Sequence, residues 1–306
     1  MMAVQPDSPS PTLPASPPPA EFSPKAALRR RMWRHKGLLS GFSMMSVVAL
    51  MALLSPLIAP HDPHEQVLSK RLLPPVWEAG SQTTHLLGTD HLGRDYLSRL
   101  LYGARVSLLI GLGSASIGGL IGVTLGVCAG YFGGRVDQVI QYFLTCQLAL
   151  PSLLMTMSLV FLIGPSVPVL MVVIGALHWT YYLVVTRATT MQIRQLDYIA
   201  AALALGSSRR QIMVYDILPN LLNPVVVIFT LEVGIAILSE AALSFLGLGV
   251  QAPTPSWGLM IAEGKQSMFF RPWLVLLPGI VLFLLVIGTN LMGDGIRDLT
   301  APENRD

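Results

Sequence analysis

Six long runs of apolar residues divide this chain, and shorter polar segments separate them. The runs are Leu38 to Ala59, Ser107 to Gly130, Val136 to Leu162, Val167 to Val185, Val225 to Leu246 and Trp273 to Gly293. Each is close to the roughly 20 residues that a helix needs to cross a hydrocarbon core of about 30 Å. The runs are too long and too continuously apolar for the alternating pattern of a membrane barrel. They predict an all-α, polytopic membrane bundle with about six transmembrane helices.

The overall composition supports a membrane environment. Hydrophobic residues make up 52% of the chain and charged residues 12%, and the mean hydropathy is +0.60. A soluble domain carries roughly 25% charged residues. The chain therefore has too few charges to solvate a globular surface, and lipid is the expected solvent. A net charge of +3 does not indicate nucleic acid as a partner.

The same pattern divides the chain into segments. Residues 1–36 form a tail rich in Pro and Ser, expected to be disordered, that ends in a basic segment. Residues 37–60 form the first transmembrane helix, which is longer than the apolar part of a signal peptide and lacks a clear cleavage site. We expect an extracytoplasmic loop at 61–106, a core of five transmembrane helices at 107–293 with a cytoplasmic loop at 187–224, and a cytoplasmic tail at 294–306.

The basic residues favour an orientation with both termini in the cytoplasm. In that orientation, thirteen of the 20 Lys and Arg residues lie in inside segments. Five of the seven outside charges lie in one long loop, Pro60 to Arg105. The excess of basic residues inside agrees with the positive-inside rule. The predicted location is the inner membrane of a bacterium, with several passes.

Small residues form a stripe on the second predicted span. They recur at every fourth position, on one face of a helix: Ser114, Gly118, Gly122, Gly126 and Gly130. Small residues let a neighbouring helix approach closely in lipid. The stripe therefore predicts helix packing rather than a ligand site.

Two glutamates lie in the fifth predicted span. A charge near the bilayer centre costs about 2.5–3.5 kcal/mol on insertion scales, so Glu232 and Glu240 are expected to face the bundle or a water-filled path. Their spacing is close to two helical turns and places them on nearly the same face. Two interpretations stay open: they line a translocation path, or they hold helices together through hydrogen bonds.

The sequence shows no catalytic or metal-binding motif. Cys128 and Cys146 lie inside apolar runs, and the spacing of the histidines matches no metal site, so no metal is expected. The chain also lacks a phosphate-binding loop and an H-E-x-x-H element, which argues against an enzyme. Arg94 and Asp95 could pair in the outer loop, where they are interpreted as solvated charges.

The longest cytoplasmic loop contains structure of its own. It is predicted to form two short helices broken by Gly206. Ser208 and Gln211 have the spacing of a capping box, so the second helix should begin there and end before Pro219. The loop is expected to present a compact helical projection to the cytoplasm.

At this loop the sequence resembles a known family. The segment Asp197 to Gly206, followed by Ile217-Leu218-Pro219-Asn220, is similar to the coupling loop, or EAA loop, of ABC importer permeases. Three further segments resemble the second permease subunit of dipeptide, oligopeptide and nickel importers: Leu87 to Arg105, Ala242 to Gly258 and Gly293 to Asp298. The resemblance extends from about Leu38 to the end of the chain.

This resemblance implies a type I ABC importer permease fold and a permease subunit that forms half of a translocation path for di- or oligopeptides. It implies a sister permease as heterodimer partner, two ATPase subunits that bind ATP and Mg, and a periplasmic or lipid-anchored binding protein; no cofactor is expected in this chain. The residues it assigns to ATPase coupling are Ala200, Ala201, Ala202, Leu205, Gly206, Ser207, Asp216, Pro219 and Asn220. Two of them depart from the family pattern, because Ala200 replaces the usual Glu and Asp216 the usual His.

Three other functions stay open for this sequence. The same permease role could serve nickel complexes, glutathione or another small solute. An ion-coupled secondary transporter that uses Glu232 or Glu240 would need broken helices or an inverted repeat, and no repeat is detectable in the hydropathy. A membrane scaffold that does not transport would use the cytoplasmic loop for docking only.

Overall fold

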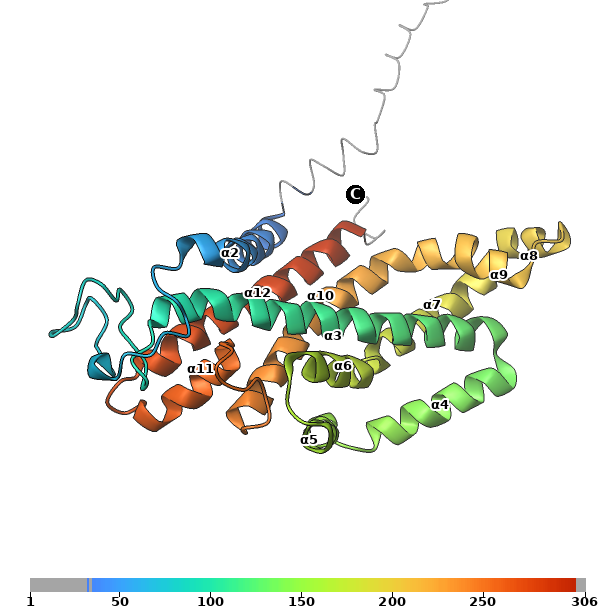
Figure 1. Ribbon diagram of the computed structural model, residues 1–306. Coiled ribbons are helices and arrows are strands. Elements are labelled where there is room, and N and C mark those ends of the chain that lie inside the picture. The colour runs from blue at the N-terminus through green and yellow to red at the C-terminus, as the bar shows by residue number, and fades with distance from the viewer. Residues whose placement is uncertain (1–31, 33–34, 301–306) are drawn as a thin grey trace, which may run out of the picture.

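The computed structural model describes Met32 and residues 35–300. The Pro- and Ser-rich tail predicted to be disordered, and nearly all of the basic segment, lie outside the described residues. The described part is helical, and its bridge between Thr89 and Asp95 is isolated rather than part of a strand. The prediction of an all-α membrane bundle is confirmed (Figure 1).

The long helix α3, Tyr96–Phe132, is the centre of the bundle and packs against α2, α6, α7 and α10. Its 37 residues extend over about 55 Å, well beyond a hydrocarbon core. It begins eleven residues before the predicted run at Ser107, because Asp95 caps it by accepting a 2.8 Å hydrogen bond from the backbone N–H of Ser98. Residues 96–106, which the sequence assigned to the outer loop, thus form the first three turns of α3.

The third apolar run does not form one straight span. It contains α4, Gly134–Leu148, and α5, Ser152–Ile163, which meet at an angle of 86°. The break falls at Pro151, which lacks an N–H for the helical ladder and disfavours helical geometry at Leu150. The described residues therefore contain five helical spans, or six if the bent pair counts as one.

The helix of the fourth run continues beyond Val185 into the predicted cytoplasmic loop and ends at Arg194. Helices α6, Val167–Leu177, and α7, Thr180–Arg194, together form a span of 28 residues with a short break at His178 and Trp179. Then follow α8, Asp197–Ala204, α9, Arg209–Gln211, and the π-helical segment η2, Ile212–Ile217.

The predicted helix end before Pro219 is wrong. Helix α10, Leu218–Phe245, follows η2 directly, and Pro219 lies in its first turn, where a missing N–H costs little. The wider turn of η2 shifts the hydrogen-bond register at this junction. The side-chain amide of Asn220 also donates a 2.6 Å hydrogen bond to the carbonyl of Asp216.

The remaining elements are α2, Lys36–Ile58, η1, Leu68–Lys70, α11, Trp257–Gly264, η3, Lys265–Ser267, and α12, Trp273–Thr300. Helix α12 packs along α2 and continues beyond the predicted end of the span at Gly293. The imidazole of His35 at the start of α2 lies 3.1 Å from the carboxylate of Asp298. The beginning of α2 and the end of α12 therefore lie side by side.

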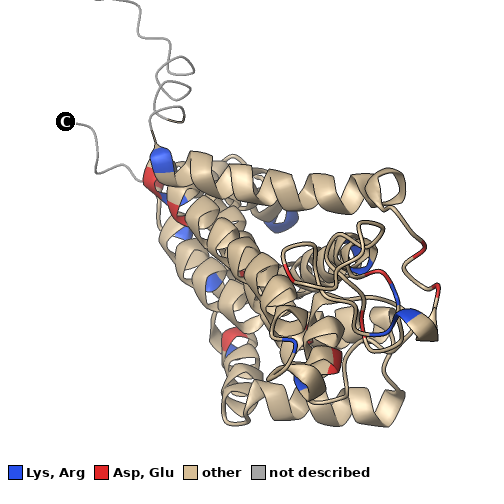
Figure 2. Cartoon of the chain, turned by 90° about the vertical axis from the view of Figure 1, so that its left-hand side faces the viewer, with Lys and Arg blue, Asp and Glu red and all other residues tan. Residues whose placement is uncertain are grey.

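The molecule has two distinct ends, joined by α3. Near one end, the indole N–H of Trp257 in α11 donates to the carbonyl of Leu100; near the other, Tyr131 packs in a cluster with Ile199 and Ile212. Leu100 and Tyr131 are separated by about 46 Å along the helix axis. Figure 2 shows long stretches of helix without Lys, Arg, Asp or Glu. Large apolar side chains such as Leu57, Leu120 and Leu162 are more than 70% exposed, as lipid contact requires.

Candidate functional site

The segment from α8 to η2, residues 197–217, forms a helical projection at one end of the molecule, which we call the knob (Figure 1). It is anchored by Ile199, Ile212 and Ile217, which are at most 1% exposed and pack against Val127 and Tyr131 of α3. Its outer face carries exposed apolar side chains, among them Leu203 and Leu205, which is 88% exposed, beside the exposed charges of Arg209 and Arg210. The knob is thus fixed to the bundle on one side and open on the other.

Gly206 sets the shape of the knob. Its φ of +88° is in the left-handed region, which a side chain disfavours. The N–H of Ser207 donates to the carbonyl of Ala202, and the N–H of Gly206 donates to that of Leu203. This pair of bonds is a Schellman motif, which ends α8. Ser208 then caps α9 by accepting from the backbone N–H of Gln211, as the sequence predicts.

The residues assigned to coupling fall into two groups. Ala200, Ala201, Leu205 and Gly206 are exposed, and Ala202 and Ser207 are half-buried beside them. Asp216, Pro219 and Asn220 lie at the junction between η2 and α10, where Asn220 contacts the carbonyl of Asp216 and, at 3.5 Å, the hydroxyl of Tyr198. The residues of the first group form a surface of the knob. Those of the second group lie behind this surface, where η2 meets α10.

A cavity of about 310 Å³ lies beside the knob. It is lined by Tyr131, Phe132, Arg194, Ala200, Leu203 and Arg209. No sequence pattern indicates this cavity, because its walls come from α3, α7, α8 and α9 and are brought together only by the fold. The guanidinium of Arg194 lies 5.8 Å from the ring centre of Tyr131, so the cavity has a basic and aromatic character.

The two glutamates of α10 have different partners and do not share an open face. The carboxylate of Glu232 lies 3.0 Å from Nδ1 of His178, at the break between α6 and α7. Glu240 is fully buried and accepts hydrogen bonds from the hydroxyls of Ser244, at 2.7 Å, and Ser256, at 2.9 Å. Both carboxylates thus connect α10 to other parts of the chain.

The stripe on α3 faces α6 and α7. A side chain at Gly118 would meet the carbonyl oxygens of Gly175 and His178 at 3.1 Å. One at Gly122 would meet the carbonyl of Trp179, one at Gly126 the hydroxyl of Thr186, and one at Gly130 the carbonyl of Arg187. Ser114 donates a 3.0 Å hydrogen bond to the carbonyl of Met171. The stripe is the surface on which α6 and α7 lie.

Arg94 and Asp95 of the outer loop are buried, which overturns their interpretation as solvated charges. Arg94, only 1% exposed, pairs with Asp90 at 2.6 Å and with Glu263 of α11 at 2.9 Å, rather than with Asp95. Arg99 is fully buried and also contacts Glu263, at 2.8 Å. Two guanidinium groups and two carboxylates thereby join the loop, α3 and α11. The sequence could not indicate this network, because Glu263 is remote in the chain.

Two family models match the chain. Residues 122–305 match the model described as "Binding-protein-dependent transport system inner membrane component", and residues 23–75 match the "N-terminal TM domain of oligopeptide transport permease C". The larger match covers more than half of the chain and includes the knob.

Several curated proteins are similar over nearly their whole length. The "Di/tripeptide transport system permease protein DppC" of Pseudomonas aeruginosa is 42% identical over 95% of this chain and 96% of its own. The "Dipeptide transport system permease protein DppC" of Haemophilus influenzae is 39% identical over 93% and 98%. The "Glutathione transport system permease protein GsiD" of Pectobacterium atrosepticum is 34% identical over 90% and 89%.

The apolar spans, the helical knob and these matches agree, and they confirm the resemblance noted in the sequence. The chain belongs to the family of binding-protein-dependent transport system inner membrane components, and is a multi-pass inner-membrane permease subunit of an ABC importer.

Proposed function

We propose that this permease forms half of the translocation path of a peptide importer, and that the knob is the point at which ATPase subunits drive it. The observation that carries this proposal is a group of exposed apolar side chains, Leu205 the most exposed of them, on a segment anchored to both α3 and α10. A displacement of the knob would therefore be passed to two helices that extend across the membrane. ATP and Mg are bound by two ATPase subunits, and this chain performs no catalysis.

The positions of the helix ends support an orientation with the knob in the cytoplasm. Helix α12 begins near Tyr96, whose ring lies edge-on to Trp273 with ring centres 5.3 Å apart, at the end opposite the knob. It ends beside His35 at the start of α2. Both ends of the described chain therefore lie on the knob side, as expected for two cytoplasmic termini.

A sister permease is the proposed partner for the bent pair α4–α5. Large apolar side chains on this pair are exposed in the single chain: Tyr142, Phe143, Leu148, Leu154, Phe161 and Leu162. A surface this apolar needs lipid or another subunit to cover it. We assign it to the heterodimer interface, on which the second half of the translocation path assembles.

Di- or oligopeptides are the proposed substrates, delivered by a periplasmic or lipid-anchored binding protein to the end opposite the knob. The names of relatives that are 39–42% identical over nearly the full chain support this assignment. Glutathione, itself a small peptide, is the substrate in the name of the relative at 34% identity. ATP-dependent uptake of labelled tripeptides by the reconstituted complex, with glutathione as competitor, would separate these substrates.

The proposed coupling is tested by Leu205→Asp. The side chain is almost fully exposed, so a charge there should leave folding unchanged but disrupt an apolar contact with an ATPase. We expect a loss of at least tenfold in ATP-dependent uptake by proteoliposomes, and weaker co-purification of the ATPase subunits.

The matched control is Phe269→Asp, which places the same charge at a residue that is 86% exposed near α11, at the opposite end. It should leave co-purification of the ATPase subunits unchanged. Wild-type uptake by the Leu205→Asp variant would refute the coupling role. Uptake driven by a pH gradient without ATP would instead favour the ion-coupled alternative.

A further inference from the structure

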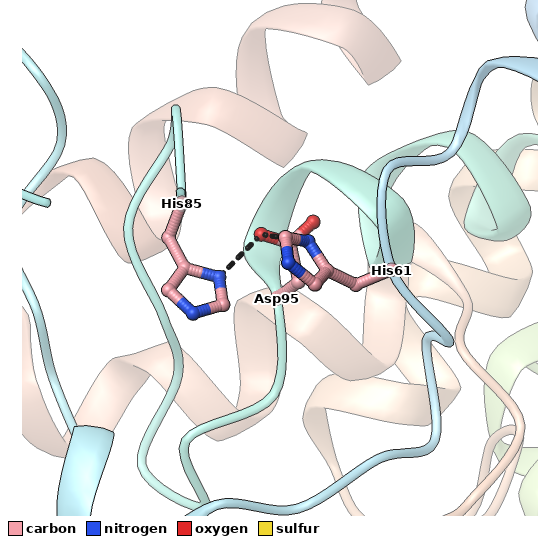
Figure 3. A group of neighbouring side chains, drawn as sticks. All are labelled: His61, His85 and Asp95. Carbon is pink, nitrogen blue, oxygen red and sulfur yellow. Dashed lines mark hydrogen bonds and ion pairs between the residues drawn. The ribbon is translucent and has the colours of Figure 1, made fainter. Parts of the chain in front are cut away.

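The geometry points to a binding site for a divalent transition-metal ion of the Zn²⁺ class, formed by His61, His85 and Asp95 in the loop between α2 and α3. Figure 3 shows the ring of His85 beside the carboxylate of Asp95 and the ring of His61 overlapping that carboxylate in this view. The three side chains can each offer one ligand atom within 4.8 Å of the others. This inference is independent of the transport function proposed above.

The distances fit a shared ion. Oδ1 of Asp95 lies 3.0 Å from Nδ1 of His85 and 3.7 Å from Nδ1 of His61. Two ligands of a tetrahedral zinc ion, each about 2.0–2.1 Å from the metal, lie roughly 3.3 Å apart. The two observed distances lie on either side of this value. Small rotations of the rings would place all three atoms around one ion.

Oδ1 of Asp95 and Nδ1 of His85 form a 3.0 Å hydrogen bond with each other, which an ion bound to both atoms would replace. Oδ2 of Asp95 already caps α3 by accepting from the N–H and hydroxyl of Ser98, which leaves Oδ1 facing the histidines. Nδ1 of His61 is buried and has no hydrogen-bond partner. A buried nitrogen without a partner is costly, and a metal ion would supply one.

The backbone holds the ligands in place. The hydroxyl of Ser98 donates to Asp95 and also accepts a 3.1 Å hydrogen bond from the backbone N–H of His61. One side chain in α3 therefore positions two of the three ligands. The rings of His61 and His85 lie 4.6 Å apart, centre to centre, and are inclined by 31°. Supporting contacts of this kind are typical of metal sites.

The surroundings favour a cation. The three residues line a cavity of about 50 Å³, which has room for an ion and a water molecule. Asp62 and Glu65 also line it, and Lys70 is its only lining cation among the described residues. With neutral imidazoles, three carboxylates face one ammonium. Two histidines and one carboxylate suit zinc-class ions and leave a fourth position for water.

The nearby group of Asp90, His91 and Glu263 offers a useful contrast. There the guanidinium groups of Arg94 and Arg99 already pair with both carboxylates, so the positive charge is supplied by the protein. At the His61 group no guanidinium lies against Asp95 in the described structure. Of the two groups, the one formed by His61, His85 and Asp95 has both the ligand atoms and the excess of negative charge that an ion needs.

Lys70 allows a second test of the site, in which a substitution should strengthen metal binding rather than weaken it. Its ammonium lies 3.4 Å from Nε2 of His85, the nitrogen that faces away from Asp95. When an ion binds Nδ1, Nε2 carries a proton and no longer accepts from Lys70, so this flexible side chain has to turn away. Removing its charge should therefore strengthen metal binding.

The experiment uses the full-length chain in lipid nanodiscs, with any affinity tag removed and metal stripped by a chelator. Titration with Zn²⁺ by calorimetry should show one site per chain, and Co²⁺ should give the visible absorption of a four-coordinate ion. We expect His61→Ala and His85→Gln to weaken affinity by at least tenfold, and Lys70→Gln to strengthen it several-fold. Binding of Zn²⁺ should also raise the thermal unfolding temperature of the wild type.

His64→Ala is the matched control, because His64 is an exposed histidine in the same loop and should not alter binding. Thermal unfolding without metal checks that each variant folds. The His61 ring is 32% exposed, so its removal is tolerable even if His85→Gln proves unstable. The absence of stoichiometric binding, or wild-type affinity in the folded His61→Ala variant, would overturn the proposal.

Discussion

At the scale of the residue, buried polar side chains in this permease have partners from distant segments. Glu240 contacts the N-cap residue of α11, Glu232 contacts His178, and Arg94 contacts Glu263. Each would cost several kcal/mol in an apolar interior if left alone. The two glutamates of α10 therefore both make contacts outside their own helix, and a role in holding helices together, one of the two interpretations that the sequence left open, stays a prediction.

Glu240→Gln and Glu240→Ala should separate this role from that of a charge in the path. The amide oxygen of Gln can accept from Ser244 and Ser256, whereas Ala leaves both buried hydroxyls without their acceptor. We expect Ala to destabilise the chain by about 1–3 kcal/mol and Gln to cost much less. Thermal unfolding in one detergent measures both, and equal losses would contradict the argument.

At the scale of the element, close packing explains why α3 tolerates its glycines. Carbonyl oxygens and side chains of α6 and α7 occupy the space that side chains at Gly118, Gly122, Gly126 and Gly130 would need. Backbone cannot move aside as a flexible side chain can. In lipid this contact replaces the hydrophobic driving force that would join two helices in water.

Gly122→Ala should therefore destabilise the bundle even though alanine favours helices. The added methyl group would meet the carbonyl of Trp179 and lie 2.6 Å from Cβ of Tyr182, an overpacking that costs about 1–3 kcal/mol. The control is Gly279→Ala in α12, where nothing lies within 4 Å of the new methyl group. Its unfolding temperature should stay equal or rise. A Gly122→Ala variant as stable as this control would show that α6 and α7 can shift.

At the scale of the whole molecule, α3 separates a polar loop at one end from the knob at the other. The buried ion pairs of Arg94 and Arg99 belong to the first end, and Ile199 and Leu205 to the second. The distance between these ends exceeds the thickness of a hydrocarbon core. The knob and the loop are therefore expected on opposite sides of the membrane.

Cysteine labelling tests this arrangement. In a chain whose Cys128 and Cys146 are replaced by Ala, Gln82→Cys in the outer loop and Gln211→Cys in the knob each add one exposed thiol. In spheroplasts, a membrane-impermeant maleimide should modify the first by at least tenfold more than the second. Permeabilisation should make the two equal. Labelling of Gln211→Cys in intact spheroplasts would place the knob outside and exclude its coupling role.

The sequence by itself determined the apolar spans, the all-α class, the break at Gly206 and the family, because each depends on local composition, local backbone preference or a contiguous motif. Only the tertiary structure decided the bend at Pro151, the early start of α3, the partners of Glu232 and Glu240, and the meeting of His61, His85 and Asp95. The bend had a local signal in Pro151, but its angle depends on the surrounding packing. The early start of α3 also had a local signal in its cap at Asp95. The other features depend on contacts between separate segments of the chain, and no periodicity or spacing encodes which distant side chain will satisfy a buried charge.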